Sequence, residues 1–311
     1  MRIVSEDEVR QHLHPAALIR ALELAFRDRY PRISIPARVH IPMDGGVFLI
    51  MPCHDRERGL LGAKFVSVLG RSDADLEGSV QATFLLFDPV STRPRVLIPA
   101  GDLTEIRTAA TSALATKFLA RNDATTLGIF GTGRQARAHL RVMPLVRNFR
   151  RVLVCARNKE QARTFCEEML AASDLPLLPV DANECASESD VICTCTTSSA
   201  PLFDGKHLRP GTHLNLVGAF QPQSREVDSA VVAAATVVVD TYQGALAEAG
   251  DLLVPLAEGV IDRDHLKMDL HELLSANFRL SSGEITVFKS VGCALEDLVA
   301  AELLEENLSL H

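Results

Sequence analysis

The feature that most restricts the fold of this chain is a glycine-rich turn that joins a strand-like segment to a helix-like one. An apolar run at residues 126–130 enters the turn, and a stretch with helical spacing of apolar residues leaves it. In the GxGxxA pattern the first glycine allows a tight turn, the second lets the backbone approach a pyrophosphate, and the small third residue lets helix and strand pack closely. The pattern predicts a dinucleotide site, with an ordinary glycine-rich turn as the alternative. The residues of the turn are Gly131, Thr132, Gly133, Arg134, Gln135 and Ala136.

Residues 126–240 continue with the alternation that such a turn requires. Strand-like runs, mostly separated by helical stretches, lie at residues 126–130, 151–156, 177–180, 190–196, 212–218 and 235–240. This alternation is typical of a parallel, doubly wound sheet. The first 100 residues differ, because one helical stretch at residues 5–30 precedes short apolar runs between turn residues. Strands in direct succession indicate an antiparallel or mixed sheet.

The length of the chain agrees with this division into two parts. At roughly 150 residues per domain, 311 residues correspond to two domains. We expect an α/β chain with a Rossmann-type doubly wound parallel sheet at residues 119–284. Residues 1–118 with 285–311 are expected to form a second, α+β domain. The last segment contains one more strand and an amphipathic helix, which we expect to pack on the first domain.

Charge and composition exclude several classes of function. There are 32 Lys and Arg residues and 40 Asp and Glu residues, so the formal charge is −8, and an acidic chain repels the phosphate backbone of nucleic acids. No apolar run approaches the roughly 18 residues of a membrane helix, and the N-terminus lacks the apolar core of a signal peptide. The seven cysteines are odd in number and scattered, which argues against disulfides or a metal site. We expect a cytoplasmic protein without a nucleic-acid partner, a membrane partner or a metal.

The residues after the second strand of the alternating region bear on the choice of dinucleotide. An acid at this place accepts hydrogen bonds from the ribose hydroxyls of NAD, whereas a nearby arginine binds the 2′-phosphate of NADP. The chain has no acid there and continues with Arg157, Asn158 and Lys159. We therefore expect NADP(H) to be preferred over NAD(H), with Arg157 as the ligand of the 2′-phosphate, Lys159 as a second cation beside it, and Asn158 in the same cofactor-binding segment. The alternative is that both cations are solvated residues at a helix start.

Three further cations occupy unusual settings. Lys64 interrupts an apolar strand, although a lysine in such a place is more often an edge residue whose ammonium reaches water. Arg107 falls in the first turn of the helix expected at residues 103–120, with Thr104 as its N-cap, where a cation costs about 0.3–1 kcal/mol. That cost is understandable if Arg107 and the helix end hold an anion such as a carboxylate, and a solvated arginine is the alternative. Arg38 lies in a stiff extended segment, and the sequence does not separate a ligand from a surface residue.

Around these cations the chain resembles the ornithine cyclodeaminase/μ-crystallin family, and the likeness covers nearly its whole length. So many ordered matches are far more specific than any one of them. The matching stretches are PAR (36–38), LIMP (49–52), GAKFVSV (62–68), ATFLLFDP (82–89), LTEIRTAATSALATKFLA (103–120), GIFGTGRQA (128–136), LVGAFQPQSREVD (216–228), VVVDT (237–241), EAGDLL (248–253) and FKSVGCALEDLVAA (288–301).

The resemblance implies a homodimer whose first domain binds the substrate and forms the dimer. It implies that Arg38, Lys64 and Arg107 hold the α-carboxylate of an imino or amino acid beside the nicotinamide. Met51 would line the same pocket, and Lys64 or a water would keep a proton on the substrate nitrogen during hydride transfer. We also expect Thr108, Val217 and Gly218 to contact the dinucleotide.

Members of the family reduce imines of amino acids, oxidise amino acids, or cyclise ornithine to proline with loss of ammonia. The cyclodeaminases carry an acid after the VGG/VGA turn and another at the end of the second strand, where this chain has Phe220 and Ala156. Glu226 and Asp228 are the nearest substitutes for the missing acid.

The chain therefore looks more like the reductases of Δ1-pyrroline-2-carboxylate and related cyclic ketimines. An apolar ring at Phe220 suits a cyclic imine, and an ordinary core phenylalanine is the other interpretation. The alternative functions are an ornithine cyclodeaminase, an amino-acid dehydrogenase, and a non-catalytic NADPH-binding protein of the crystallin type.

Overall fold

The computed structural model describes residues 1–69, 80–276, 278, 281 and 283–309 of the chain. They belong to two compact units, one formed by Met1–Arg107 with Cys293–His311 and the other by Thr108–Gly292. Helix α3 (Ala100–Leu119) contains the first of these boundaries. Within the described ranges, every helix is too short or too polar to cross a membrane.

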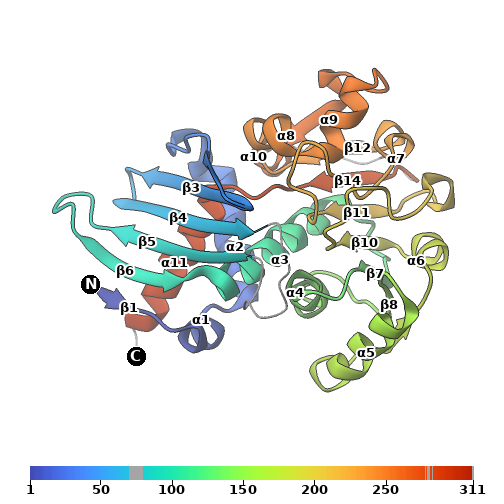
Figure 1. Cartoon of the computed structure of the whole chain (residues 1–311), viewed down its shortest axis with the longest axis horizontal. Coiled ribbons are helices and arrows are strands. Elements are labelled where there is room, and N and C mark those ends of the chain that lie inside the picture. Colours follow the sequence, from blue (N-terminus) through green and yellow to red (C-terminus); the bar gives the residue numbers. More distant parts are fainter. Residues whose placement is uncertain (70–79, 277, 279–280, 282, 310–311) are drawn as a thin grey trace. The chain divides into compact units, whose positions relative to one another are not determined.

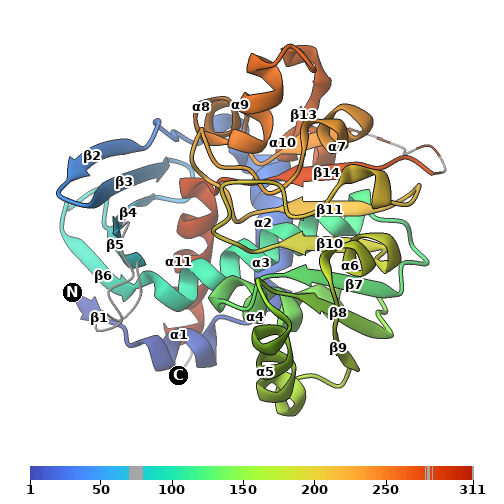
Figure 2. The same ribbon diagram turned by 45° about the vertical axis from the view of Figure 1, so that its right-hand side comes forward.

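The first unit is built on a six-stranded sheet with the order β1-β6-β5-β4-β3-β2. Strands β2 to β6 pair antiparallel, and β1 pairs with β6 in parallel. Helix α11 (Ala294–Ser309) packs on the central strands, and α2 (Pro15–Leu24) packs on α11 (Figure 1 and Figure 2). The strands are β1 (Arg2–Ile3), β2 (Val39–Met43), β3 (Gly46–Asp55), β4 (Leu60–Leu69), β5 (Val80–Phe87) and β6 (Pro94–Pro99).

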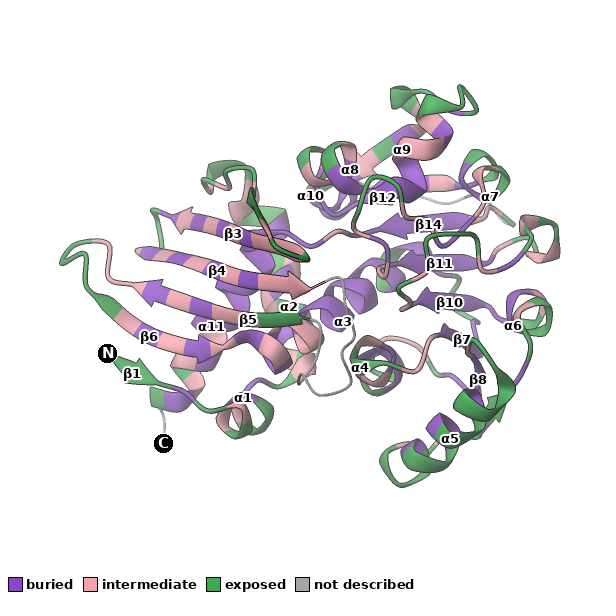
Figure 3. Cartoon of the chain, viewed as in Figure 1, coloured by how far each residue is buried: buried purple, intermediate pink, exposed green. Residues whose placement is uncertain are grey.

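Burial alternates along the strands of this sheet, as Figure 3 shows. Met51, Lys64, Phe84 and Ile98 lie opposite one another on β3, β4, β5 and β6, and all four are buried. Residues directly opposite each other share one face of a sheet, so Lys64 points to the face on which α11 packs. The neighbours of these residues along each strand are only half-buried.

The prediction of a single helix at residues 5–30 is wrong, because Pro15 interrupts the helical stretch. Helix α1 (Glu6–His12) begins at a capping box in which Ser5 and Glu8 exchange hydrogen bonds. Pro15 then opens α2 and keeps the preceding residue, His14, in an extended conformation. A π-helical turn (Ala25–Arg29) and a 3-10 turn (Tyr30–Arg32) follow α2.

The second unit contains an eight-stranded, wholly parallel sheet with the order β13-β12-β14-β11-β10-β7-β8-β9. All six expected strands occur within two residues of their predicted ends, and the prediction of a Rossmann-type doubly wound sheet is confirmed. The strands are β7 (Thr126–Phe130), β8 (Arg151–Cys155), β9 (Leu177–Pro179), β10 (Val191–Thr194), β11 (His213–Leu216), β12 (Thr236–Val239), β13 (Leu266–Asp269) and β14 (Thr286–Lys289).

Short helices connect these strands. They are α4 (Arg134–Val142), α5 (Lys159–Met169), α6 (Ala182–Glu188), α7 (Ser229–Ala234), α8 (Tyr242–Glu248), α9 (Gly250–Ala257) and α10 (Leu270–Ser275).

The boundaries of the units differ from the expected ones at 118/119 and 284/285. Strand β14 lies between β11 and β12, so the strand expected to join the first domain belongs to the parallel sheet. The second half of α3 also belongs there. Asn215 Nδ2 donates to Thr116 Oγ1 over 2.9 Å, and Thr286 Oγ1 donates to the carbonyl of Leu119 over 3.1 Å. The first unit therefore ends at Arg107 and resumes at Cys293.

Candidate active site

The glycine turn after β7 has a conformation that only glycine tolerates at its first position. Gly131 has φ +108°, and its N–H donates to the carbonyl of Cys155 over 2.8 Å. A Cβ at this residue would lie 2.5 Å from the carbonyl oxygen of Cys195. A glycine is therefore required at position 131, because the ends of β7 and β10 approach each other too closely for a side chain.

The second glycine is different, because the fold itself does not need it. Gly133 is the N-cap of α4 with an extended backbone, and a Cβ there would meet open space. Gly133 has no side chain with which to cap α4. The first N–H groups of a helix have no partners within the helix itself. Gln135 adds a buried side-chain oxygen without a hydrogen-bond partner among the described residues, and Ala136 is fully buried. An open cradle at an uncapped helix start fits the pyrophosphate of a dinucleotide.

Strand order places the other candidate cofactor residues around this turn. From β7 the chain proceeds to β8 and β9 on one side of the sheet, and β10 and β11 lie on the other side. Ligands of doubly wound sheets bind at the carboxyl ends of the strands where the order reverses, here between β7 and β10. The ends of β8, β10 and β11 therefore flank the glycine turn.

The end of β8 presents the expected cations to solvent. The side chains of Arg157 and Lys159 are exposed, and neither makes a hydrogen bond or ion pair among the described residues. Asn158 caps α5 by accepting a hydrogen bond from Gln161 N over 2.9 Å. Cys155 pairs with Phe130, so this segment directly adjoins the glycine turn.

The ends of β10 and β11 bring the remaining candidates of this unit together. Val217 N donates to the carbonyl of Thr194 over 3.2 Å, and a Cβ at Gly218 would lie 2.2 Å from the carbonyl oxygen of Thr196. Val217 and Gly218 are half-buried. Phe220 is also half-buried, so it is not an ordinary core residue. Thr108 lies on α3, where the second unit begins, and is 9% exposed.

The two acids considered as substitutes at position 220 are engaged within the fold. Asp228 caps α7 through Val231 N at 2.8 Å and accepts from Gly205 N at 2.8 Å. Glu226 is fully buried, and both of its oxygens accept hydrogen bonds from neighbouring loops. Neither carboxylate is available to a substrate amine.

In the first unit, two of the three predicted cations meet at one carboxylate. Lys64 Nζ lies 2.9 Å from both oxygens of Asp297, and Arg107 Nε donates to Asp297 Oδ1 over 3.0 Å. Arg107 Nη1 also donates to Glu296. Lys64 is 2% exposed and Arg107 5% exposed, and both acids are fully buried. We call these four residues the buried charge cluster.

Two expectations about these cations are corrected. Helix α3 begins at Ala100, so Thr104 lies inside it and Arg107 is in its third turn, beyond the reach of the N-terminal dipole. Two acids on α11 offset its burial instead. Lys64 does not lie at a sheet edge, since β4 is paired with β3 and β5, and its ammonium does not reach water.

The environment of Lys64 changes its acidity. Burial and then the nearby Arg107 lower the pKa of its ammonium group to about 8, against the opposing effect of Asp297. The proton is therefore bound below about pH 8 and lost above it. A lysine that exchanges a proton near neutral pH is suited to acid–base chemistry.

Met51 and Arg38 lie near the cluster along the sheet. Met51 is 3% exposed and pairs directly with Lys64. Arg38 is half-buried and immediately precedes Val39, which pairs with Ile50. The register thus places Arg38 beside the row that contains Met51 and Lys64.

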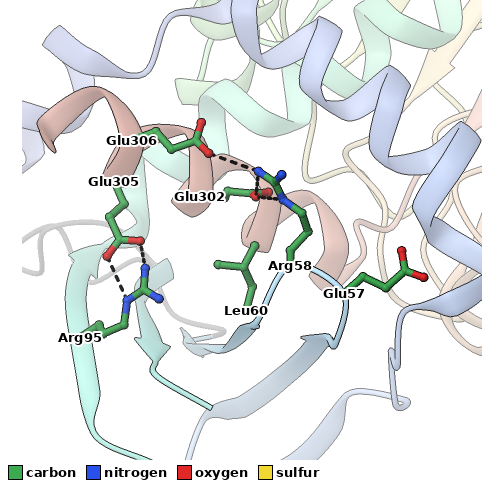
Figure 4. Close-up of a pocket in the computed structure, with 7 residues that line it drawn as sticks. All are labelled: Glu57, Arg58, Leu60, Arg95, Glu302, Glu305 and Glu306. Carbon is green, nitrogen blue, oxygen red and sulfur yellow. Dashed lines mark hydrogen bonds and ion pairs between the residues drawn. The ribbon is translucent and has the colours of Figure 1, made fainter. Parts of the chain in front are cut away.

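A surface hollow of about 310 Å³ in the same unit is not part of this arrangement. It lies at the C-terminal half of α11, and Figure 4 shows its cations engaged with acids. Arg58 pairs with Glu302 and Glu306, and Arg95 pairs with Glu305. The residues that line the hollow include none of the predicted site residues.

Glu296 and Asp297 are the residues that the sequence interpretation missed. Their signal is two adjacent acids inside the apolar stretch VGCALEDLVAA. Buried acids are rarely unpaired, so this stretch could have indicated cationic partners. It could not have shown which cations they pair with.

The two glycines of the turn allow a matched test of the dinucleotide site. Gly133→Ala should change the free energy of unfolding by less than about 1 kcal/mol. It should weaken NADPH binding at least about tenfold, or about 1.4 kcal/mol, because the new methyl group occupies the cradle. Gly131→Ala should instead destabilise the protein by about 1–3 kcal/mol through backbone strain. Urea unfolding and calorimetric titration measure both effects, and a Gly133→Ala protein that binds NADPH as tightly as wild type would contradict the assignment.

Comparisons with known proteins agree with this organisation. The model of the Ornithine cyclodeaminase/mu-crystallin family matches residues 1–310. A Δ1-pyrroline-2-carboxylate reductase of Bacillus cereus is 35% identical, over 99% of this chain and 96% of that protein. The ketimine reductase mu-crystallin of Rattus norvegicus is 33% identical, over 98% of this chain and 97% of that protein. The solved structure of Thermococcus litoralis Δ1-pyrroline-2-carboxylate reductase with NADH and L-proline has a TM-score of 0.96 and 35% identity, covering 100% of this chain and 98% of that one. The chain belongs to the ornithine cyclodeaminase/mu-crystallin family.

Proposed function

We propose that this protein is an NAD(P)H-dependent reductase of cyclic imino acids, which converts substrates such as Δ1-pyrroline-2-carboxylate to L-proline. It would thus be an oxidoreductase that acts on C–N bonds. The observation that carries the proposal is the buried charge cluster, in which Lys64 and Arg107 share Asp297. The similarity to reductases named for this substrate, one of them solved with NADH and L-proline, supports it.

In this proposal Arg38, Lys64 and Arg107 bind the α-carboxylate of the substrate, and Met51 lines the pocket. Asp297 and Glu296 balance the charges of Lys64 and Arg107. Arg38 contributes a third cation beside them, immediately before β2. Fixing the carboxylate in this way orients the imine carbon, which can lower the barrier by several kcal/mol. Phe220 provides an apolar surface for the substrate ring.

Lys64 also supplies the proton that the reduction requires. An imine carbon accepts hydride readily when its nitrogen is protonated, and the nicotinamide supplies that hydride when the dinucleotide is bound. Asp297 holds the ammonium of Lys64 in place at 2.9 Å, and its pKa of about 8 lets it give up a proton near neutral pH. Lys64 is therefore the proposed catalytic residue.

The same geometry disfavours ornithine cyclodeamination. A substrate with a second amine needs an acid beside it, and position 220 is a phenylalanine. Glu226 and Asp228 are committed to backbone groups, as described above. The charge cluster in turn disfavours a protein that only stores NADPH, because such a protein needs only the dinucleotide-binding unit.

A substrate panel tests the proposed reaction. Purified protein should oxidise NADPH, followed by absorbance, with Δ1-pyrroline-2-carboxylate or its six-membered homologue. Proline formation from ornithine without net NADPH oxidation would indicate a cyclodeaminase instead. Oxidation of NADPH only with pyruvate and an amine would indicate an amino-acid dehydrogenase, and inertness towards the whole panel would indicate a binding protein.

The acidity of Lys64 predicts the pH dependence of that activity. The kcat/KM for imine reduction should fall above about pH 8, because the ammonium loses its proton there. Lys64→Met should lower kcat/KM by about 10²–10⁴. Lys64→Arg should lower kcat/KM by a similar factor and remove the alkaline decline, because a guanidinium keeps the positive charge but does not give up its proton. The exposed Lys267, replaced by Met, is the control, and an unchanged profile in Lys64→Arg would refute the role.

We further propose that the dinucleotide is NADP(H) in preference to NAD(H). Gly131, Thr132, Gly133, Arg134, Gln135 and Ala136 would hold the pyrophosphate, and Thr108, Val217 and Gly218 would contact the rest of the cofactor. Arg157 and Lys159 are exposed cations beside the turn, and the place that accepts ribose hydroxyls in NAD sites has no acid. Asn158 orients the start of α5 between them.

Replacing Arg157 by Ala should therefore lower the ratio of kcat/KM for NADPH to that for NADH by about tenfold to a hundredfold. That range corresponds to losing a charge-assisted hydrogen bond to the 2′-phosphate. Lys159→Ala should act in the same direction with a smaller effect. The control is Arg163→Ala, which removes an exposed cation one turn further along α5. A wild-type protein that prefers NADH, with a ratio insensitive to Arg157→Ala, would rule out the preference.

We also propose that the protein is a homodimer formed through the sheet of the first unit. The face opposite α11 is apolar and only half-buried, and it includes Phe48, Ile50, Phe65, Leu85 and Leu97. The rings of Phe48 and Phe65 stack with centroids 6.3 Å apart on this face. A second copy of the chain would cover it, since such faces are seldom left in water.

Sedimentation measurements test the dimer. Phe65→Asp should yield a folded monomer, because a carboxylate in an apolar interface would lose its hydration. Val90→Asp, at an exposed position in the same unit, should leave the dimer intact. A wild-type monomer, or a dimer that persists in Phe65→Asp, would contradict the proposal.

A further inference from the structure

The loop that follows β11 is folded around a buried carboxylate. Glu226 is fully buried, and its side chain reaches back to the backbone at the start of its own loop. Its Oε2 accepts from Gly218 N at 2.8 Å and from Ala219 N at 3.2 Å. The same oxygen accepts from the hydroxyl of Thr194 at 2.7 Å.

The other oxygen of Glu226 holds the segment after β10. Its Oε1 accepts from both the backbone N–H of Thr196, at 2.9 Å, and the hydroxyl of Thr196, at 2.7 Å. One carboxylate therefore receives five donors from the two strand ends on one side of the glycine turn. A Cβ added at Gly218 would lie 2.4 Å from Glu226 Oε1, so a residue with a side chain could not lie this close to the acid.

Two more buried charges complete the arrangement. Lys289, at the end of β14, donates to the carbonyl of Ala219 over 2.5 Å and to Asp251 Oδ2 over 2.8 Å. Asp251, at the start of α9, accepts from the backbone N–H of Glu226 at 2.6 Å. Ala219 is thus held through its N–H by Glu226 and through its carbonyl by Lys289. The next residue is Phe220.

None of these three charged side chains is placed to touch a ligand. Glu226 and Lys289 are 0% exposed and Asp251 is 1% exposed, so they act only through the backbone that they hold. That backbone lies at the carboxyl ends of β10 and β11. The adenine half of a dinucleotide belongs on the β8 side of the glycine turn, so its nicotinamide half belongs on this side.

We propose that Glu226, with Asp251 and Lys289, is a positioning group that fixes residues 217–220 for contact with the nicotinamide half of the dinucleotide. The inference rests on the proposed dinucleotide-dependent function. Asp251 and Lys289 hold Glu226 and Ala219 in register, and Glu226 ties that loop to Thr196. A buried acid that served only stability could be lost without selectively changing how one half of the cofactor binds.

The isosteric Glu226→Gln variant separates these roles. An amide has one acceptor oxygen and one NH₂ group, so two or three of the five donors would face another donor. The loop must then shift to relieve the unpaired groups. The readout is binding, measured by calorimetric titration with NADPH and with 2′-phospho-ADP-ribose, which lacks the nicotinamide. The pair NADH and ADP-ribose is measured in parallel.

Wild type should bind each whole dinucleotide more tightly than its fragment. In Glu226→Gln this advantage should shrink by about tenfold or more, while the affinity for the fragment stays within about twofold. Asp228→Asn is the matched control. It makes the same carboxylate-to-amide change in the same segment, keeping the α7 cap but losing the acceptor for Gly205 N, and Asp228 does not contact residues 217–220. An equal loss for dinucleotide and fragment, or no change for either, would overturn the proposal.

A second variant applies if Glu226→Gln does not fold. Thr194 is fully buried on β10. Thr194→Val removes the hydroxyl that donates to Glu226 at 2.7 Å and also lies 3.5 Å from the carbonyl of Asn215. The dinucleotide advantage should then fall by about threefold, and an unchanged advantage would count against the positioning group. Wild-type protein that binds neither dinucleotide nor fragment would instead refute the proposed function itself. Wild type that binds both equally well would refute only the positioning of the nicotinamide.

Discussion

The shared carboxylate of Asp297 is the interaction on which the arrangement of the first unit depends. Moving a lysine and an arginine out of water is costly, and their burial is tolerable only with acids at contact distance. Helix α11 supplies two such acids to cations from two distant parts of the chain, Lys64 on β4 and Arg107 on α3. Apolar residues of similar size would often fold as well or better in such a place. The proposal that Lys64 and Arg107 bind a substrate carboxylate gives these buried charges a role that stability alone does not.

In the second unit, buried carboxylates compensate buried backbone N–H groups, just as they compensate buried cations in the first. Glu226 collects five donors from the ends of β10 and β11, and Asp240, at the end of β12, accepts from the N–H groups of Val291 and Gly292. In each case a buried carboxylate accepts hydrogen bonds from loop N–H groups. The glycine turn remains open in contrast, with an uncapped helix at Gly133. Rigid strand ends around one open cradle are what a dinucleotide site requires.

The sequence predicted most of the parallel sheet because each strand is a short run of β-branched and apolar residues between turns, as in Thr236–Val239. It did not predict that β14 returns to the middle of that sheet, since strand order depends on contacts that no local pattern encodes. The candidate site is likewise only partly predictable. Local patterns mark Lys64 and Arg107 as unusual, but they cannot show that Lys64 pairs with Asp297, which lies 233 residues further along the chain. The start of α3 was misplaced because Ala100 and Gly101 carry no capping signal of the usual kind.

The most direct test of the central claim is a crystal structure of the protein with NADP⁺ and L-proline bound together. The account predicts that the proline carboxylate lies within about 3.2 Å of side-chain nitrogens from Lys64 or Arg107, with Arg38 close by. It also predicts that Asp297 keeps its contact with the lysine. A proline carboxylate bound away from all three cations, with the buried charge cluster undisturbed, would contradict the account.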